Sequence, residues 1–403
     1  MQSLLNKKIV LGISGGIAAY KTPELARLLM QEGASVQVVM TEAAQQFVTP
    51  VTMQALTGNP VYTSQWDSSI ANNMAHIELS RSADVILIAP TSADLMAKLS
   101  LGLADDLLST LCLARDCPLL LAPAMNKQMW EHAATQRSAE RLNADSVTLL
   151  GPASGFQACG EVGMGRMLEP AEITEQVIAF FQKKSLAGKK VLITAGPTFE
   201  AIDPVRGITN QSSGKMGFAI ARAALEAGAQ VHLIAGPCDL PTPLEATGKI
   251  IRSNVVSAKE MHAATLNASD CDVFFAVAAV ADWGIEKPAR EKIKRQGKEA
   301  PSIEFSANPD ILLDIAKTVK TKGGKPHPYC VGFAAESTDL EKHADEKRRR
   351  KGIPMIVGNI GPDTFGSDLN QLLVIDANGS KKIAKAEKLD LARQLIQLVA
   401  KKI

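Results

Sequence analysis

The sequence predicts an α/β protein of two domains in series, each built on a parallel sheet with helices on both faces. Three observations indicate this fold class. A strand, glycine turn, helix and second strand occur twice, at residues 7–40 and again at residues 189–234. The strand candidates are continuous aliphatic runs, as expected for strands that are buried on both faces. The length of 403 residues is also enough for two full hydrophobic cores.

The composition restricts the functional classes. Hydrophobic residues make up 46% of the chain and charged residues 21%, with a formal net charge of +2. A near-neutral chain lacks the concentrated basic excess of a nucleic-acid-binding surface. No apolar run approaches the roughly 18 residues of a membrane span, and no signal peptide is recognisable. The six cysteines form no CxxC pair, which argues against zinc and disulfides. We expect a cytoplasmic protein without nucleic-acid or membrane partners.

The first half opens with a buried strand, Ile9–Ile13, and a turn of small residues at Ser14, Gly15 and Gly16. Small residues let backbone N–H groups and a helix N-terminus approach an anion such as a flavin phosphate. A tight turn without a ligand is the alternative. The GxGxxG pattern of a nicotinamide dinucleotide site is absent. Thr41 ends the second strand, where it can cap a helix or contact a ligand.

Two further strands end in polar turns. Asp84–Ala89 is followed by Pro90–Asp94, and Leu119–Ala122 is followed by Pro123–Asn126. The carboxyl ends of parallel strands are where ligands bind in doubly wound sheets. Asn126 can orient a carboxylate or an amide, or it can be a helix N-cap.

A glycine-rich segment, Ser154–Met167, surrounds Cys159. Such a segment is typical of a flap that closes over a site, where the thiol can deliver a proton or act as a thiolate. A surface loop with an incidental thiol is the alternative. His76 precedes a central strand, and by itself such a histidine is more typical of a packed or surface residue than of a catalyst.

Together these features resemble the flavin-containing cysteine decarboxylases over roughly residues 5–182. The resemblance is carried by Ser14–Ile17, His76, Pro123–Asn126, Ala158–Gly160 and Gly165–Met167. It implies a flavodoxin-like (Rossmann-like) flavoprotein domain at residues 1–182. In that family FMN takes a hydride from a cysteine moiety, which eases decarboxylation, and then returns it.

The same resemblance implies roles for single residues. His76 would be the active-site base, Asn126 would hold the substrate carboxylate, and Cys159 would supply the proton of the reductive half-reaction. The residues implied in contact with FMN are Ser14, Gly15, Gly16, Thr41, Ser92, Ser109 and Met125.

After a polar linker at residues 183–190, the second half begins with the strand Val191–Ala195 and a Gly-Pro turn. A later Gly-Lys pair is not a P-loop, because Met216 follows Lys215. We expect Ser212 or Ser213 to cap a helix over residues 214–227, with its amino end free for a phosphate. Arg206 and Asn210 would lie in the loop that faces this end.

Charged residues follow the later strands of the second half. Asp282 comes after the strand Asp272–Ala278, where an aspartate can reach a nucleotide phosphate through Mg²⁺. Lys292 lies in what is either a solvated basic loop or a lid over a triphosphate. Lys347 and Lys351 are four residues apart and share one helix face, although exposed lysines commonly only keep a surface soluble.

The second half resembles phosphopantothenate–cysteine ligases from about residue 189 onward. The match is carried by Ile208–Gly217, Ala278–Asp282, Lys292–Lys294, Asn308–Asp310 and Gly332–Glu336. It implies a Rossmann-like nucleotide-binding ligase domain at residues 191–403. In the bacterial bifunctional proteins this ligase follows the decarboxylase in the same chain. There a nucleoside triphosphate, usually CTP, activates 4′-phosphopantothenate as an acyl-cytidylate, and the amine of cysteine displaces CMP.

By this resemblance Asn210 would act on the acyl-nucleotide, and Lys292 would stabilise charge as pyrophosphate leaves, with Lys294 as an open alternative. Asp282 would also bind Mg²⁺ through the nucleotide. The choice between CTP and ATP stays open. The residues implied in contact with CTP are Ala276, Val277, Ala278, Asp282, Lys292, Pro309, Asp310, Ile311, Leu312, Phe333, Lys347 and Lys351.

The expected function is therefore a bifunctional enzyme of coenzyme A biosynthesis with small-molecule substrates. The resemblance also implies a homo-oligomer, with trimers or dodecamers formed through the first domain and dimers of the ligase domains. A flavin or nicotinamide oxidoreductase with two Rossmann-like domains is one alternative, and the missing GxGxxG and the presence of Cys159 and His76 count against it. A non-catalytic flavodoxin-like regulator is another, but it would not need the Cys159 segment and would usually carry acidic extensions.

Overall fold

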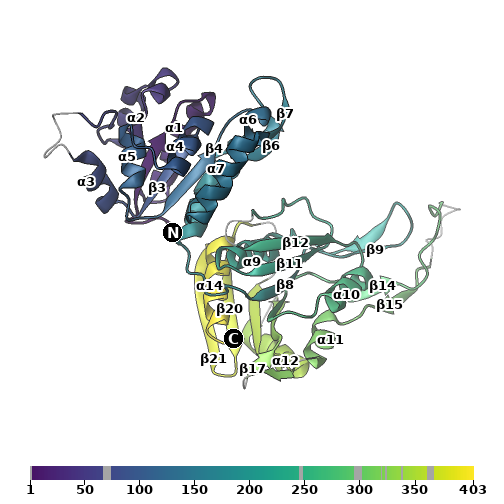
Figure 1. Ribbon diagram of the computed structural model, residues 1–403. Helices are drawn as coiled ribbons and strands as arrows, with labels where there is room; N and C mark the ends of the chain where they lie inside the picture. Colours follow the sequence, from purple (N-terminus) through teal and green to yellow (C-terminus); the bar gives the residue numbers. More distant parts are fainter. Residues whose placement is uncertain are drawn as a thin grey trace. The chain divides into compact units, whose positions relative to one another are not determined.

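The computed structural model describes residues 2–66, 74–244, 248–294, 302–318, 320–322, 325–336, 339–360 and 367–403. The chain divides into two compact units, Met1–Phe181 and Gln182–Ile403, which are described separately (Figure 1). Each unit packs helices against a largely parallel sheet, which confirms the expected α/β fold class. In the described ranges no helix has both the length and the apolar character needed to cross a bilayer.

The first unit is built on a five-stranded parallel sheet with the strand order β2-β1-β3-β4-β5. This flavodoxin-like order changes direction between β1 and β3, so ligands are expected beyond the carboxyl ends of those two strands. An antiparallel hairpin, β6–β7, lies outside this sheet. The elements are β1 (Lys8–Ile13), η1 (Ile17–Lys21), α1 (Thr22–Gln31), β2 (Ser35–Met40), η2 (Ala43–Gln46), α2 (Pro50–Thr57), α3 (Ala75–Ser82), β3 (Val85–Thr91), α4 (Ala93–Leu101), α5 (Leu107–Leu113), β4 (Leu119–Pro123), α6 (Lys127–Glu131), α7 (Ala133–Ala144), β5 (Thr148–Leu149), β6 (Ala153–Phe156), β7 (Val162–Arg166) and α8 (Pro170–Phe181).

Both faces of this sheet are covered, which explains the aliphatic strands. Successive side chains of a strand point to opposite faces. Val85 and Leu87 of β3 therefore pack into one core with residues of α1 and α8. Ile86 and Ile88 pack into the other core with residues of α4, α5 and α7.

The second unit has an eight-stranded sheet in the order β12-β11-β8-β13-β18-β19-β20-β21. The first six strands are parallel, and β20 and β21 are added antiparallel. The direction of winding changes between β8 and β13. The elements are β8 (Lys190–Ala195), β9 (Phe199–Ala201), β10 (Gly207–Thr209), α9 (Lys215–Glu226), β11 (Gln230–Ala235), β12 (Lys249–Asn254), α10 (Ala258–Asn267), β13 (Val273–Ala276), β14 (Trp283–Ile285), β15 (Phe305–Ala307), α11 (Ile311–Lys317), β16 (Lys320–Lys322), β17 (Lys325–His327), β18 (Tyr329–Glu336), α12 (Leu340–Lys351), β19 (Met355–Ile360), β20 (Leu369–Asp376), β21 (Gly379–Glu387) and α14 (Lys388–Ala400).

The polar segment at residues 183–190 packs against the end of α9. Leu186 is fully buried in the core of the second unit, and its N–H donates to the Ala227 carbonyl at 2.9 Å. The Lys184 ammonium donates to the Glu226 carbonyl at 3.0 Å. A lysine at the carboxyl end of a helix satisfies a carbonyl that has no partner within the helix.

The expected serine cap of α9 is wrong. The N-cap is Gly214, in the left-handed conformation with φ of 76° and with no side-chain cap hydrogen bond. Ser212 lies before the cap, where its Oγ accepts from the Gly214 N–H at 3.4 Å. A Cβ on Gly214 would lie 3.3 Å from the Gly196 Cα, so both the backbone angle and the close approach to the turn after β8 favour glycine.

We expect His232 of β11 to make the stability of the second unit sensitive to acid. Burial lowers its pKa below the ordinary value of 6.5, and its Nε2 lies 2.9 Å from the Ser253 Oγ. As the pH falls through about 6.5, the imidazole of the unfolded chain binds a proton before that of the folded chain does, so the free energy of unfolding decreases. We expect the thermal midpoint of His232→Gln to change less than that of the wild type between about pH 7 and pH 5. Equal pH dependence in both proteins would contradict this, and exposed His343→Gln is the matched control.

Candidate active sites

A pocket of about 590 Å³ lies at the carboxyl ends of β8 and β13, where the winding of the second sheet changes direction. Its wall combines the amino end of α9 with the loops that follow β10 and β13. The residues that line it are Gly196, Thr209 through Gly217, Val277 through Val280, Asp282, Phe333, Lys347, Asn359, Asn370 and Lys388. Helix N-termini and exposed backbone N–H groups favour anions. The pocket therefore suits a phosphorylated ligand.

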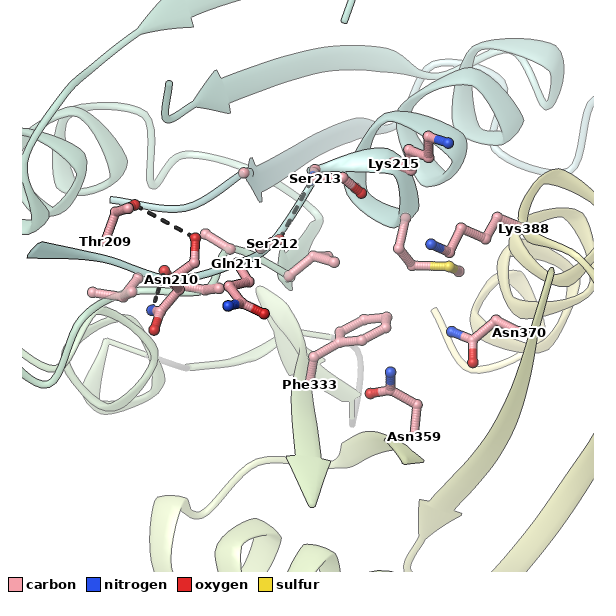
Figure 2. A pocket seen from close by; sticks show the side chains of 18 of the residues that line it. Thr209, Asn210, Gln211, Ser212, Ser213, Lys215, Phe333, Asn359, Asn370 and Lys388 are labelled. Atoms are coloured by element: carbon pink, nitrogen blue, oxygen red, sulfur yellow. Dashed lines mark hydrogen bonds between the residues drawn. The ribbon is translucent and has the colours of Figure 1, made fainter. Parts of the chain in front are cut away.

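Asn210 joins two of the loops that form this pocket (Figure 2). It directly follows β10, and its Nδ2 donates to the Ala279 carbonyl at 2.9 Å. The Ala279 N–H in turn donates to the Gly196 carbonyl at 2.9 Å. Asn210 is exposed and lines the pocket, and its amide nitrogen is held by the Ala279 carbonyl.

Asp282 lies on a loop that is held in place by hydrogen bonds on both sides. The Thr198 Oγ1 accepts from the Ala281 N–H at 3.0 Å, and the Asn308 N–H donates to the Asp282 carbonyl at 3.0 Å. The Asp282 side chain is exposed and lines the pocket. Across the described ranges no cluster of three or more His, Cys, Asp or Glu side chains is suited to hold a metal ion. A magnesium ion at Asp282 would need phosphate oxygens of a nucleotide as further ligands.

The residues at the opposite end of the pocket are not among the nucleotide contacts predicted from the sequence (Figure 2). Lys215 and Lys388 lie there with Asn359 and Asn370. The Lys215 Nζ is 2.7 Å from an Asp368 carboxylate oxygen. Burial, with Lys215 nearby, lowers the pKa of Lys388. Asn359, Asn370 and Lys388 come from β19, β20 and α14, and no local pattern marks such residues as parts of a site.

The remaining expected nucleotide contacts lie partly outside this pocket. Lys347 and Phe333 both line it, and the Lys347 Nζ donates to the Phe333 carbonyl at 3.0 Å. Lys351 instead pairs with Asp310, the N-cap of α11.

At the start of α11, the backbone groups rather than the side chains are available to contact a nucleotide. Ile311 and Leu312 are 5% and 8% exposed and belong to the core, so only their backbone groups remain for a ligand. Ala276 ends β13 and Pro309 precedes the α11 cap, and neither lines the pocket.

Lys292 is exposed and is not among the residues that line the pocket. The same holds for Lys294. The residue between them, Ile293, is hydrogen-bonded to the turn that joins β9 and β10. Both lysines therefore lie on a segment that is bonded to the turn before the pocket-lining loop, and nothing in their positions distinguishes Lys292 from Lys294.

In the first unit, Ser14 joins the two strands at the point where the winding changes direction. Its Oγ donates to the Pro90 carbonyl and accepts from the Ser92 N–H, both at 2.8 Å, and its side chain is buried. Ser92 caps α4 by accepting from the Leu95 N–H at 3.2 Å. These hydroxyl groups shape the turn, so a ligand here would be met by the backbone as much as by the hydroxyls.

The glycines of this turn fit a bound phosphate. A Cβ on Gly15 would lie 2.5 Å from the Ala43 Cβ, whereas a Cβ on Gly16 would extend into open space. No described residue accepts a hydrogen bond from the N–H of Gly15 or Gly16. Thr41 is close by in the fold, since its N–H donates to the Ile13 carbonyl. The turn therefore presents free donors and room for a phosphate, as the flavin expectation requires.

The β6–β7 hairpin, which carries Cys159 in its turn, is attached to the loop that carries Asn126. The segment expected as a flap forms an antiparallel pair, with Cys159 exposed in its turn. The hairpin is fixed to the Asn126 loop, because the Met125 N–H donates to the Gly165 carbonyl at 2.9 Å. A Cβ on Gly165 would lie 2.4 Å from the Met125 carbonyl oxygen, so this approach requires glycine.

Buried Gln157 strengthens the same junction. Its Oε1 accepts from the Lys127 N–H at 3.0 Å, and its Nε2 donates to the Met164 carbonyl at 3.1 Å. Asn126 caps α6 through its Oδ1, which accepts from the Met129 N–H at 2.9 Å. The Cys159 Sγ lies 3.7 Å from a Glu161 carboxylate oxygen and 3.8 Å from the Gln157 Oε1.

His76 and Ser109 lie elsewhere in the first unit. His76 is half-buried on α3, and Figure 1 draws α3 and the β6–β7 hairpin at opposite ends of the unit. Ser109 is buried in α5, where it forms a capping box with Asp106 and lines a separate cavity of about 250 Å³. A single copy of the chain therefore does not assemble His76, Asn126 and Cys159 into one site.

Comparison with known proteins assigns both units. Residues 1–182 match the family described as Flavoprotein, and residues 186–403 match the DNA/pantothenate metabolism flavoprotein C-terminal domain. The coenzyme A biosynthesis bifunctional protein CoaBC of Vibrio cholerae is 47% identical over 99% of each chain. The protein of the same name from Haemophilus influenzae is 49% identical over 98% of this chain and 97% of that one. A solved structure, the FMN binding protein AtHal3, is 35% identical over 44% of this chain and 97% of that chain, with a TM-score of 0.40.

Proposed function

Because the chain belongs to the CoaBC family of bifunctional coenzyme A biosynthesis proteins, we propose that it carries out two consecutive reactions. The second unit is a phosphopantothenate–cysteine ligase, and the first is a flavoprotein that decarboxylates the ligated product to 4′-phosphopantetheine. We assign residues 1–182 to the decarboxylase, 183–190 to a linker and 191–403 to the ligase. The observation that carries the proposal is the polar pocket at the switch point of the second sheet, which joins Asn210, Asp282 and Phe333.

In the ligase, CTP and 4′-phosphopantothenate meet in this pocket. Phe333 and Lys347, which line the pocket, contact the nucleotide, and Asp282 would hold it through Mg²⁺. Lys292 stabilises the charge that develops as pyrophosphate leaves. Asn210, held by the Ala279 carbonyl, orients the acyl-cytidylate for attack by the amine of cysteine. Positioning of this kind converts a bimolecular step into an effectively unimolecular one.

In the decarboxylase, FMN supplies a reversible electron sink for loss of CO₂. The Ser14–Gly16 turn would hold its phosphate, and Thr41, Ser92, Ser109 and Met125 are further proposed contacts. Asn126 holds the substrate carboxylate, and His76 acts as a base. Cys159, on the hairpin that is anchored to the Asn126 loop, returns a proton to the product.

The decarboxylase site is shared between copies of the chain. His76 and the Cys159 hairpin lie at opposite ends of one unit, so His76 of one copy would meet Asn126 and Cys159 of another. A cyclic arrangement, a trimer or a dodecamer built from trimers, brings opposite ends of neighbouring copies together. The ligase units pair as dimers.

The direct test is incubation with 4′-phosphopantothenate, cysteine, Mg²⁺ and one nucleoside triphosphate at a time, with products identified by mass. We expect CTP to support formation of 4′-phosphopantothenoylcysteine and then of 4′-phosphopantetheine by a yellow, FMN-containing protein. Omission of cysteine should leave the acyl-nucleotide. If only ATP supports amide formation, ATP rather than CTP is the nucleotide substrate. If no triphosphate supports it, the ligase assignment is refuted.

A further inference from the structure

Asp203 is a fully buried carboxylate at the centre of the turn between β9 and β10. Its Oδ1 accepts from the backbone N–H groups of Val205 and Arg206, at 2.8 and 2.9 Å. Its Oδ2 accepts from the Arg206 Nε and Nη2, at 3.1 and 2.6 Å. Its side chain is 0% exposed, and Arg206 holds the pKa of this carboxyl well below its usual value. The residue is therefore charged and fully hydrogen-bonded, as a buried carboxylate must be.

One further donor comes from a distant part of the chain. The Ile293 N–H donates to the Asp203 Oδ2 at 3.1 Å, and the Arg206 Nη2 donates to the Ile293 carbonyl at 2.6 Å. Both backbone groups of Ile293 are thus held by one ion pair. The Ala289 N–H also donates to the Ile202 carbonyl at 2.9 Å, so the segment is attached at two points.

This attachment connects the segment that carries Lys292, proposed to act as pyrophosphate leaves, with the loop that carries Asn210, proposed to orient the acyl-cytidylate. Ile293 lies between Lys292 and Lys294, and the turn that holds it leads through β10 directly to Asn210. Among the described residues 287–294, the backbone hydrogen bonds to other parts of the chain all go to this turn. An exposed basic loop would otherwise lose conformational entropy each time it closed on a triphosphate.

We infer that Asp203 is a positioning residue of the ligase, which with Arg206 fixes the lysine segment relative to Asn210. The inference rests on the proposed ligase function. Asp203 touches no substrate and acts through Ile293, by keeping the Lys292 backbone in register with the pocket. A small displacement of a positioned group commonly costs about 100-fold in rate.

The test is Asp203→Asn in the full-length protein, with pyrophosphate release and amide formation followed separately. Asparagine has one acceptor oxygen, so it cannot accept from the Ile293 N–H and from the Val205 and Arg206 N–H groups at the same time. We expect the rate of pyrophosphate release to fall by about 10- to 100-fold with a smaller change in the KM for CTP. Asp270→Asn is the matched control, because Asp270 is 89% exposed, pairs with Lys190 and precedes the opposite end of β13.

A double mutant separates positioning from general stability. If Asp203 acts through the lysine segment, adding Asp203→Asn to Lys292→Gln should slow pyrophosphate release no further, whereas independent effects would add. Ile293→Pro removes the same hydrogen bond from the other side, and Ile293→Ala keeps it, so this pair serves if Asp203→Asn fails to fold. An active wild type with an unaffected Asp203→Asn, or with additive effects, overturns the inference. An inactive wild type would instead refute the ligase.

Discussion

Asn210→Asp is expected to stop amide formation while leaving nucleotide activation in place. Asparagine donates to the Ala279 carbonyl at 2.9 Å, and a carboxylate at this position would face that carbonyl oxygen without a proton to offer. The side chain would turn away from its anchor and would also bring negative charge to a pocket that binds anions. We expect the rate of cysteine transfer to fall by about 100-fold, the effect that displacement of a positioned group can have.

The measurement is a quenched time course in which pyrophosphate and 4′-phosphopantothenoylcysteine are quantified together. Pyrophosphate should form in a burst of one equivalent, with the acyl-cytidylate detectable by mass. Gln211→Glu is the matched control, because Gln211 lines the same pocket and this change adds the same charge without removing the contact to Ala279. Equal loss in both variants would mean that charge alone, rather than orientation by Asn210, explains the defect.

The central strands of both sheets follow from the sequence because the pattern that encodes them is local. Val85–Thr91 is buried at every position, and the aliphatic run Asp84–Ala89 predicts that strand to within two residues. The carboxyl-edge loops follow from the same reasoning, since parallel strands end at a common edge. The positions of Asn210 and Asp282 at one pocket are a consequence of this rule.

Other features depend on contacts that no local pattern records. The cap of α9 is Gly214 rather than a serine, because the chain approaches Gly196 closely at that point. Asn359, Asn370 and Lys388 belong to β19, β20 and α14, which are far from α9 in the sequence and meet at the pocket only in the folded chain. Asp203 looks in the sequence like an ordinary residue of a turn, and its bond to Ile293 is visible only in three dimensions.

The decarboxylase residues show most clearly which spatial relationships the sequence does not predict. The sequence names His76, Asn126 and Cys159 through a resemblance, but only the fold separates them within one chain. The loop that carries Asn126 and the hairpin that carries Cys159 are joined because the Met125 N–H reaches the Gly165 carbonyl. His76 stands on α3, which packs against α5. In the proposed shared site, the residues of different copies that meet would be set by the assembly, which no local sequence pattern encodes.

Cys159→Ser is expected to separate the two halves of the decarboxylation. Asn126 and His76 are untouched, so CO₂ should still be lost with oxidation of the thiol-bearing carbon. A serine hydroxyl is a much weaker acid than a thiol and would not return the proton that completes the saturated product. We expect formation of 4′-phosphopantetheine to fall by about 100- to 10,000-fold, the range attributed to a positioned general acid.

The product mass decides the outcome. The variant should release an unsaturated ene-thiol that is lighter than 4′-phosphopantetheine by two hydrogens, in an amount limited to one turnover unless an external oxidant is present. Cys117→Ser is the matched control, because it makes the same atomic change at a half-buried thiol of the same unit, away from the hairpin. Normal yield of the saturated product from Cys159→Ser would remove the thiol from the mechanism. The anchored β6–β7 hairpin would then serve to exclude water from the site rather than to deliver a proton.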